Sequence, residues 1–341
     1  MKQLWKWVFI GLGLVVALLA GGALYQAWYD RKAPNFSGSR DLYVYPGMEA
    51  AAVRDSLLAS GQVKNAASLK RAFRDVESVS AGHYRIDATC SSLYVARMLR
   101  KGWQTPVNLT LSGSIKTPGA LARKVGSQML ADSAEVARFI ASNDSLRVYG
   151  ADVRQLFTLV IPDTYELLWT ASVREIFDRL VREKDAWWTQ ERLDAARAQG
   201  LTPREVSVLA SIVDGETRYE PEQPTIAGVY LNRLRTGMML QADPTIAYCF
   251  DYKLSRILLS HLQVESPYNT YRNYGLPPGP ISCPPKSCLE AVLHPDSHHY
   301  LYFCADPSFN GSHRFASTYA EHLQNARAFQ KALTERQRGG K

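Results

Sequence analysis

The sequence has few cysteines, and it lacks the paired spacing that metal and redox motifs use. Its five cysteines are an odd number and form no CxxC pair, so neither a structural zinc site nor a thioredoxin motif is indicated. Internal repeats and low-complexity blocks are absent as well, which excludes a repeat array. The 341 residues are 46% hydrophobic, with 7 Trp, 18 Tyr and 11 Phe. This composition is typical of a folded chain, and the length allows two domains of about 100–200 residues each.

Acidic residues are fewer than basic ones. Lys and Arg total 40 against 32 Asp and Glu, which gives a formal net charge of +8. Such an excess favours an acidic partner: nucleic acid, an anionic membrane surface or an acidic polymer. Charge alone does not choose among these partners.

One long stretch, residues 7–29, has no charged side chain. As a helix it would be about 34 Å long, which is enough to cross the core of a bilayer. Lys2 and Lys6 precede it, so the positive-inside rule predicts a cytoplasmic N-terminus and an exported remainder. The alternative is a cleaved signal peptide, because Gly21 and Ala23 are small enough for a cleavage site. Both interpretations place most of the chain outside the cytoplasm, so nucleic acid is not an expected partner.

Export would also permit disulfides. Cys283 and Cys288 bracket a short loop that contains two prolines and that could be closed by a bridge. The same two residues could instead be small buried thiols, and the sequence leaves both options open because it does not supply the Cβ geometry.

The pattern after the apolar stretch predicts an α+β protein in two parts. The first part repeats a strand and a helix, with strands at 42–44, 82–86 and 107–111 and helices at 48–60 and 91–101. The second part has clear helix starts, including Thr117-Pro118, Ser172 with Glu175, and Thr202-Pro203 with Glu205. Further starts are expected at Asp243-Pro244, Ser287–Glu290 and Thr318–Glu321, and a strand at 300–304. The predicted segments are a cytoplasmic tip 1–6, a membrane helix 7–29, a tether 30–40, a small module 41–113, a larger domain 114–336 and a frayed tail 337–341.

The helix that begins at Pro203 carries an acid on its apolar face. At about 100° per residue, Glu216 falls between Leu209 and Ile212, whereas Asp214 falls on the other side. A carboxyl group in apolar surroundings has a raised pKa and can then donate a proton at neutral pH. Glu216 is therefore the candidate general acid. The alternative is a glutamate at a frayed helix end that turns to solvent.

Polar and aromatic residues follow this acid along the chain. Such groups suit a sugar, because aromatic rings stack on its faces while amides and charged groups bind its hydroxyl and acetamido groups. Each also has a simpler structural explanation, such as a helix N-cap for Asp243 or an exposed helix surface for Arg233. The candidate substrate-binding residues are Asn232, Arg233, Gln241, Asp243, Asn269 and Tyr271.

Several motifs occur in one order along the chain. They are 161–165 (IPDTY), 210–217 (ASIVDGET), 229–234 (VYLNRL), Gly237-Met238, Leu240-Gln241, Asp243-Pro244-Thr245, 268–271 (YNTY), 275–281 (GLPPGPI), His313, Phe315, Thr318-Tyr319 and Glu321-His322. Together with the N-terminal apolar stretch and the module at 41–113, they closely resemble the endolytic murein transglycosylases, the MltG or YceG-like family. In that family the catalytic glutamate is followed by a hydroxyl residue, which here corresponds to Glu216 and Thr217. The usual Glu-Lys-Glu of the family is here Asp214-Gly215-Glu216, so the first carboxylate is not expected to be essential.

The resemblance implies a LysM-like module at 41–113, a YceG-like catalytic domain at 114–336 and a membrane-anchored enzyme outside the bacterial inner membrane. It implies cleavage of peptidoglycan glycan strands at the β-1,4 bond between N-acetylmuramic acid and N-acetylglucosamine, without a metal or cofactor. Peptidoglycan synthases are the expected protein partners.

The product expected from the residues is a 1,6-anhydro end, because the motif block offers one inward acid and no second carboxylate to recruit water. Two alternatives stay open: a hydrolase that uses the same site, and a non-catalytic peptidoglycan-binding scaffold.

Overall fold

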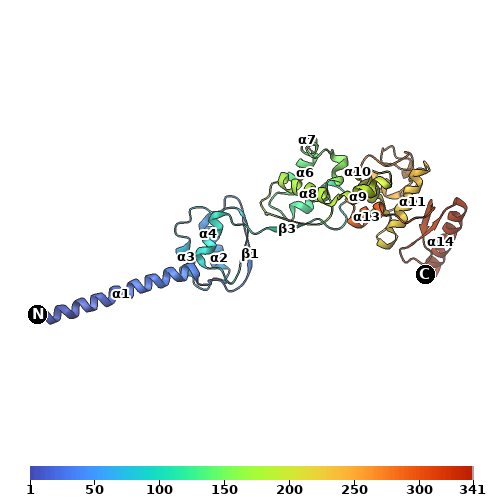
Figure 1. Cartoon of the computed structure of the whole chain (residues 1–341). Coiled ribbons are helices and arrows are strands. Elements are labelled where there is room, and N and C mark those ends of the chain that lie inside the picture. Colours follow the sequence, from blue (N-terminus) through green and yellow to red (C-terminus); the bar gives the residue numbers. More distant parts are fainter. Residues whose placement is uncertain (340–341) are drawn as a thin grey trace. The chain divides into compact units, whose positions relative to one another are not determined.

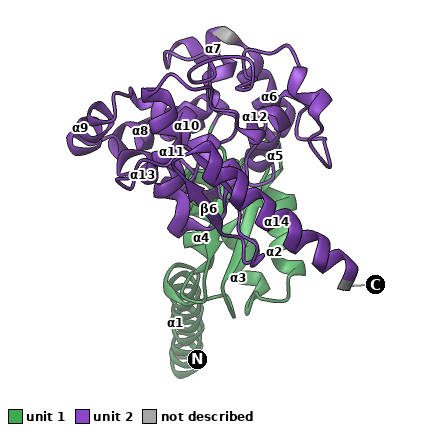
Figure 2. Ribbon diagram, turned by 90° about the vertical axis from the view of Figure 1, so that its right-hand side faces the viewer, with its two compact units in different colours: residues 1–108, 166–171 green, residues 109–165, 172–341 purple. Residues whose placement is uncertain are grey.

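The computed structural model describes residues 1–339, which form a mixed helix and sheet protein with two compact units (Figures 1 and 2). Unit 1 comprises residues 1–108 and 166–171, and unit 2 comprises residues 109–165 and the chain from residue 172 onward. The chain passes from one unit to the other inside β3 (Val107–Thr110) and again inside β4 (Thr164–Leu167), and these two strands pair with each other. The α+β prediction is thus confirmed at the level of fold class.

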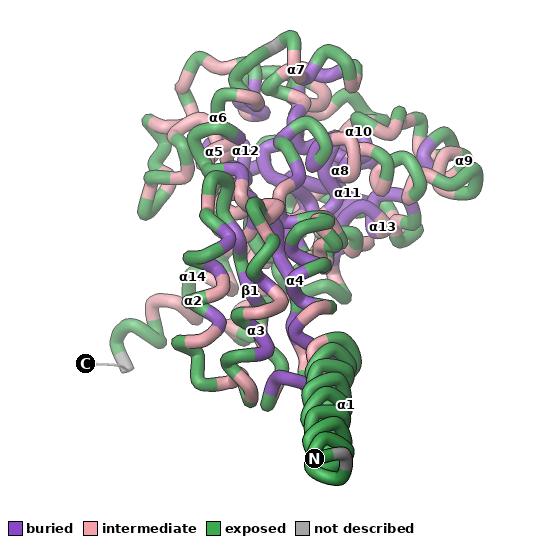
Figure 3. Tube along the Cα trace, turned by 90° about the vertical axis from the view of Figure 1, so that its left-hand side faces the viewer, coloured by how far each residue is buried: buried purple, intermediate pink, exposed green. Residues whose placement is uncertain are grey.

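The N-terminal helix α1 (Lys2–Lys32) is exposed over almost all of its length (Figure 3). Residues 3–32 are long and apolar enough to cross a membrane. This helix contains the span predicted at 7–29 and is compatible with a single-pass anchor. A signal sequence would have the same length and composition.

Unit 1 is a small strand–helix–helix–strand module with one more helix after it. Its elements are β1 (Arg40–Val44), α2 (Ala50–Ala59), α3 (Ala66–Ala72), β2 (Gly82–Ile86) and α4 (Ser92–Lys101). β1 and β2 pair antiparallel, so that Leu42 lies opposite Tyr84 in a core to which α2, α3 and α4 also contribute. The predicted strands and helices are present. The short α3 was not predicted; it begins at the N-cap Asn65, whose side chain accepts a hydrogen bond from the backbone of Ser68.

Residues 30–36, predicted as part of a tether, pack into unit 1 instead. Asp30 accepts two hydrogen bonds from the guanidinium of Arg71 at 2.8 and 2.9 Å. Asn35 is fully buried, and its side chain exchanges hydrogen bonds with Asn65 and donates to Ser92. Phe36 is 1% exposed within the same core. The polar composition of the segment suggested a flexible linker, but its polar groups are satisfied by partners distant in sequence, and they hold the end of α1 on the module.

Unit 2 is mainly helical. Its helices are α5 (Pro118–Gly126), α6 (Ser133–Ala141), α7 (Asn143–Arg147), α8 (Val173–Trp187), α9 (Gln190–Ala198), α10 (Pro203–Glu216), α11 (Gln223–Arg235), α12 (Asp243–Cys249), α13 (Lys286–Leu293) and α14 (Tyr319–Gly339). Short 3₁₀ turns lie at η1 (Val153–Thr158), η2 (Glu220–Glu222) and η3 (Leu259–Gln263), and β5 (Tyr302–Ala305) pairs antiparallel with β6 (His313–Ala316). The helix starts at Thr117, Ser172 and Thr202 are confirmed, each with a side chain that caps the helix.

The core of unit 2 surrounds α10. Every residue from Val206 to Val213 is buried, and α10 packs against α11 and α13. The helix is therefore enclosed on all sides rather than on the single apolar face that the spacing predicted. The additional buried positions are Ser207, Val208 and Ser211. Ser211 donates to the carbonyl of Val208 and accepts from the backbone of Ile281.

Two further details bear on the predictions. All five cysteines are free thiols, with Cys283 and Cys288 both buried, so the option of a disulfide between them is not realised. The predicted tail 337–341 begins inside α14, which continues to Gly339, and residues 340–341 lie outside the described residues.

Candidate active site

The candidate acid lies at the C-terminal end of α10. The helix begins with a reciprocal capping box between Thr202 and Glu205, and it ends at Glu216 because Thr217 adopts an extended backbone. Gly215, one residue before the acid, packs against α12: a Cβ atom at this position would lie 2.5 Å from Cβ of Pro244. The close approach that glycine permits brings the end of α10 to the start of α12.

Glu216 contacts a buried tyrosine from the neighbouring helix α11. The hydroxyl of Tyr230 donates to Oε1 of Glu216 at 2.6 Å, and Tyr230 is 1% exposed. The pKa of Glu216 is raised to about 7. Burial is the main cause and the charge of Asp243 adds to it, while the Tyr230 hydrogen bond and the charge of Arg233 oppose the rise. About half of these carboxyl groups therefore carry a proton at neutral pH, as a general acid requires.

Arg233 is a buried cation beside this pair, not part of an exposed helix surface. It is 8% exposed, and its guanidinium donates to the backbone carbonyls of Leu301, at 2.7 Å, and Leu240. The guanidinium carbon also lies 5.8 Å from the centre of the Tyr230 ring. Arg233 thus holds Tyr230 and the loop before α12 in place.

Asp243 does not cap α12, which corrects the prediction from sequence. The helix has Ala242 at its N-cap, and Asp243 is its first residue. Its Oδ1 atom accepts a hydrogen bond from the hydroxyl of Tyr271 at 2.6 Å. The exposed carboxylate of Asp243 thus belongs to the electrostatic surroundings of Glu216, and the site contains a second acid that the sequence argument had assigned to helix capping.

The three amide residues have different positions. Asn269 is fully buried, and its side chain donates to the carbonyls of Leu262 and Val264 and accepts from the backbone of Tyr271. The side chain of Asn232 donates to two backbone carbonyls in the segment before β5. Both amides therefore hold loops in place. Gln241 is exposed, with a left-handed backbone (φ 48°) stabilised by a hydrogen bond from its N–H to the carbonyl of Thr270.

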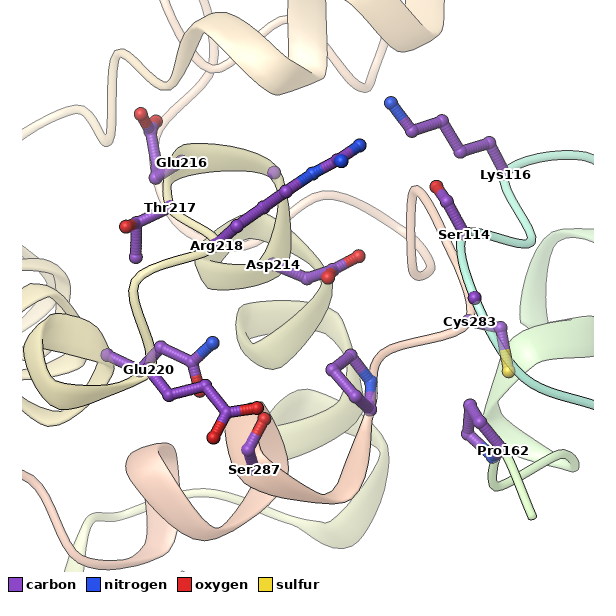
Figure 4. A pocket seen from close by; sticks show the side chains of 14 residues that line it. Ser114, Lys116, Pro162, Asp214, Glu216, Thr217, Arg218, Glu220, Cys283 and Ser287 are labelled. Carbon is purple, nitrogen blue, oxygen red and sulfur yellow. The ribbon is translucent and has the colours of Figure 1, made fainter. Parts of the chain in front are cut away.

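Asp214 borders the same cavity as Glu216, but its side chain points in another direction (Figure 4). It accepts a hydrogen bond from Ser282 at 3.0 Å, and burial raises its pKa against the opposing effects of this bond and of Lys116 and Arg218. Figure 4 shows Asp214 and Arg218 on the side of the pocket where Lys116 lies, while the carboxyl group of Glu216 points away from them. The two acids of the Asp214-Gly215-Glu216 motif thus have different hydrogen-bond partners, Ser282 for Asp214 and Tyr230 for Glu216.

Tyr230 belongs to the motif at 229–234, but the sequence did not identify it as the partner of Glu216. The sequence also did not predict Lys116, Arg218 and Gln223, which line the pocket beside Asp214. Tyr230 had a weak signal, a hydroxyl in an otherwise apolar buried stretch. Lys116 had none, because it lies about 100 positions before Asp214 in the chain.

A half-buried carboxyl group with a pKa near neutrality at the end of an enclosed helix defines a site for acid–base chemistry. Comparisons with known proteins identify its family: the model of the YceG-like family matches residues 42–328. The chain therefore belongs to the YceG-like family, as the motifs indicated.

Two relatives and one solved structure agree with this assignment. An endolytic murein transglycosylase of Bacillus subtilis is 34% identical over 151 residues, which is 44% of this chain and 41% of the relative. One from Streptococcus pneumoniae serotype 2 is 26% identical over 91% of this chain and 63% of the relative. A crystal structure of a YceG-like protein from Listeria monocytogenes has a TM-score of 0.53 at 26% identity, covering 84% of this chain and 99% of that one. The chain spans 41–63% of the length of these two transglycosylases.

Proposed function

We propose that the protein is an endolytic lytic transglycosylase of peptidoglycan, which cleaves the β-1,4 bond between N-acetylmuramic acid and N-acetylglucosamine. The observation that carries the proposal is Glu216: a carboxyl group with a pKa of about 7, held by Tyr230 at the position of the family's catalytic glutamate. Membership of the YceG-like family and the names of the two relatives support the same substrate.

In the proposed mechanism Glu216 acts first as an acid and then as a base. Its proton passes to the oxygen that leaves C1 of the muramoyl sugar, so the glycosidic bond breaks as an O–H bond forms. The resulting carboxylate takes the proton of the C6 hydroxyl of the same sugar, and that oxygen closes on C1. The products are a 1,6-anhydromuramoyl end and a free hydroxyl on N-acetylglucosamine. Tyr230 and Arg233 lower the pKa of the acid and so favour its ionised form between the two steps.

Asp243 favours a second candidate, a hydrolase with the same acid. Retaining hydrolysis uses two carboxyl groups about 5–5.5 Å apart, and inverting hydrolysis a pair about 6.5–9.5 Å apart. Asp243 is near enough to Glu216 to raise its pKa, so the site holds a carboxylate that could serve water. The hydrogen bond from Tyr271 opposes that role, because it already occupies Oδ1 of Asp243, which would otherwise accept a proton from water.

Digestion of glycan strands in ¹⁸O-labelled water separates the two reactions. The transglycosylase predicts anhydro ends without label, and a hydrolase would give labelled reducing ends, detected by mass spectrometry of the products. Unchanged strands would instead support a non-catalytic scaffold.

The rest of the chain is proposed to present this site to newly made strands. We infer that α1 anchors the protein in the bacterial inner membrane with its N-terminus in the cytoplasm, since Lys2 and Lys6 flank the apolar run on that side. The strand–helix–helix–strand order of unit 1 supports a LysM-like module, and the exposed Tyr43 and Tyr45, which pack on Trp169, offer aromatic surface for sugars. Association with peptidoglycan synthases would place the cut close to synthesis.

A further inference from the structure

A cavity of about 550 Å³ lies at the end of α10, on the side of Asp214 (Figure 4). It is bordered by the loop before α5, by the residues that follow Glu216 and by the start of α13. Glu216 and Thr217 also border it, but the proposed reaction uses none of the other groups that line it.

The cavity carries charges of both signs. Arg218 and Lys116 contribute two cations, and Asp214 and Glu220 contribute two acids. Within residues 1–339 neither cation forms an ion pair, although the Lys116 ammonium lies 4.7 Å from the centre of the Tyr252 ring. The charged groups are thus available to a ligand that itself carries carboxylates and an amine.

A buried side-chain amide that lines this cavity also lacks one hydrogen-bond partner. Gln223, the first residue of α11, is 4% exposed, and its side-chain carbonyl has no hydrogen-bond partner among residues 1–339. A buried carbonyl without a hydrogen-bond partner destabilises the folded chain. A donor such as a peptide N–H would remove that penalty.

We propose that this cavity binds the peptide attached to the muramoyl sugar whose glycosidic bond is cut. Arg218 and Lys116 would bind the carboxylates of the peptide, Asp214 and Glu220 its amino group, and the carbonyl of Gln223 a backbone N–H. The inference rests on the proposed function, because peptidoglycan supplies a peptide of this charge pattern beside every cleavable bond.

The dimensions agree with this assignment. A tetrapeptide extends at most about 13–14 Å, and a helix with its side chains is about 10–12 Å across. A peptide that starts at a sugar beside Glu216 can therefore pass around the end of α10 and reach the Asp214 side. Thr217 and Arg218 border that path, since they directly follow the acid.

Binding can be measured apart from cleavage. The probe is the N-acetylated tetrapeptide L-Ala-γ-D-Glu-L-Lys-D-Ala, titrated by calorimetry into the full-length Glu216→Gln chain in detergent. Adding Arg218→Gln to this chain is expected to raise Kd roughly tenfold or more, as is amidation of the peptide carboxylates, because charge-assisted hydrogen bonds are lost. Adding Arg182→Gln, which removes an exposed arginine of α8, is the matched control and should leave Kd unchanged. The proposal is overturned if Glu216→Gln alone, with Arg218→Gln and with Arg182→Gln all bind the peptide equally, or if none of them binds it.

Gln223→Leu distinguishes a ligand contact from a structural role. If its carbonyl binds the peptide, this change weakens binding severalfold and leaves the melting temperature equal or higher, since an unpaired buried carbonyl is removed. A lower melting temperature with unchanged peptide binding contradicts the role of Gln223.

Cleavage assays test peptide recognition and the proposed transglycosylase function separately. The wild-type chain is expected to have a higher kcat/KM on strands that bear peptides than on strands stripped by an amidase, and Arg218→Gln should reduce this ratio. A ratio of one in the wild type, with both strands cleaved, overturns peptide recognition and leaves the transglycosylase intact. Failure to cleave either strand overturns the proposed function, and the calorimetric titration still decides whether the cavity binds the peptide.

Discussion

Replacing Glu216 by glutamine should separate catalysis from stability. The amide keeps the size of the side chain and an oxygen that can accept the Tyr230 hydrogen bond, but it cannot deliver a proton. Cleavage is expected to fall by roughly 10²–10⁴-fold, the contribution typical of a general acid.

The same change should stabilise the folded chain at alkaline pH. The pKa of Glu216 rises from its usual value of 4.5 to about 7, so between these values the folded state binds more protons than the unfolded state. Stability from this group is therefore lost as the pH rises from about 4.5 to 7. A pKa difference of about 2.5 corresponds to about 3 kcal/mol, and the partial exposure of Glu216 reduces the expected effect to about 1–2 kcal/mol. Glutamine does not ionise, so the variant does not lose this folding stability as the pH rises.

The measurement compares melting temperatures and cleavage at pH 5 and pH 8. For a domain the size of unit 2, the variant should melt roughly 2–8 °C higher than the wild type at pH 8 and much closer to it at pH 5. Asp214→Asn is the matched control, since it removes another partly buried carboxyl of the same helix and should reduce cleavage far less. Near-normal cleavage by Glu216→Gln, or a variant less stable than the wild type at pH 8, would refute this reasoning.

Three further predictions follow from the surroundings of this acid and from α1. Because the proposed reaction starts with protonated Glu216, kcat/KM should fall above about pH 7. Tyr230→Phe should move this fall to higher pH and Asp243→Asn to lower pH, and shifts of both variants in the same direction would contradict the effects assigned to these residues. Gly215→Ala should lower the melting temperature by several degrees and reduce cleavage, because the new Cβ would overlap the neighbouring proline of α12. Gly119→Ala is the control and should be tolerated, because its Cβ would meet only a flexible side chain at 3.5 Å. A reporter that works only outside the cytoplasm should be active when fused to the C-terminus, and activity of a cytoplasmic reporter alone would refute the predicted topology.

Local sequence signals determined most of the secondary structure. The capping boxes at Ser172 and Thr202 and the Thr117-Pro118 start each specify a helix through hydrogen bonds within four residues, so they could be recognised without knowledge of the fold. The position of Glu216 on the inward side of its helix followed from the helical period alone. The uncharged run of α1 is equally local.

Only the tertiary structure decided which groups surround that acid. Tyr230 reaches Glu216 from another helix, and Asp243 could be distinguished from a helix cap only by its bond to Tyr271, 28 positions further along the chain. Residues 30–36 looked like a tether because their polar groups have no local partners, yet Asn65, Arg71 and Ser92 satisfy them in the fold. The sequence by itself determined where several helices start and which residue is the candidate acid, since those depend on neighbours along the chain. The pKa of the acid and the charged cavity beside Asp214 depend on side chains brought together by packing, which no local pattern encodes.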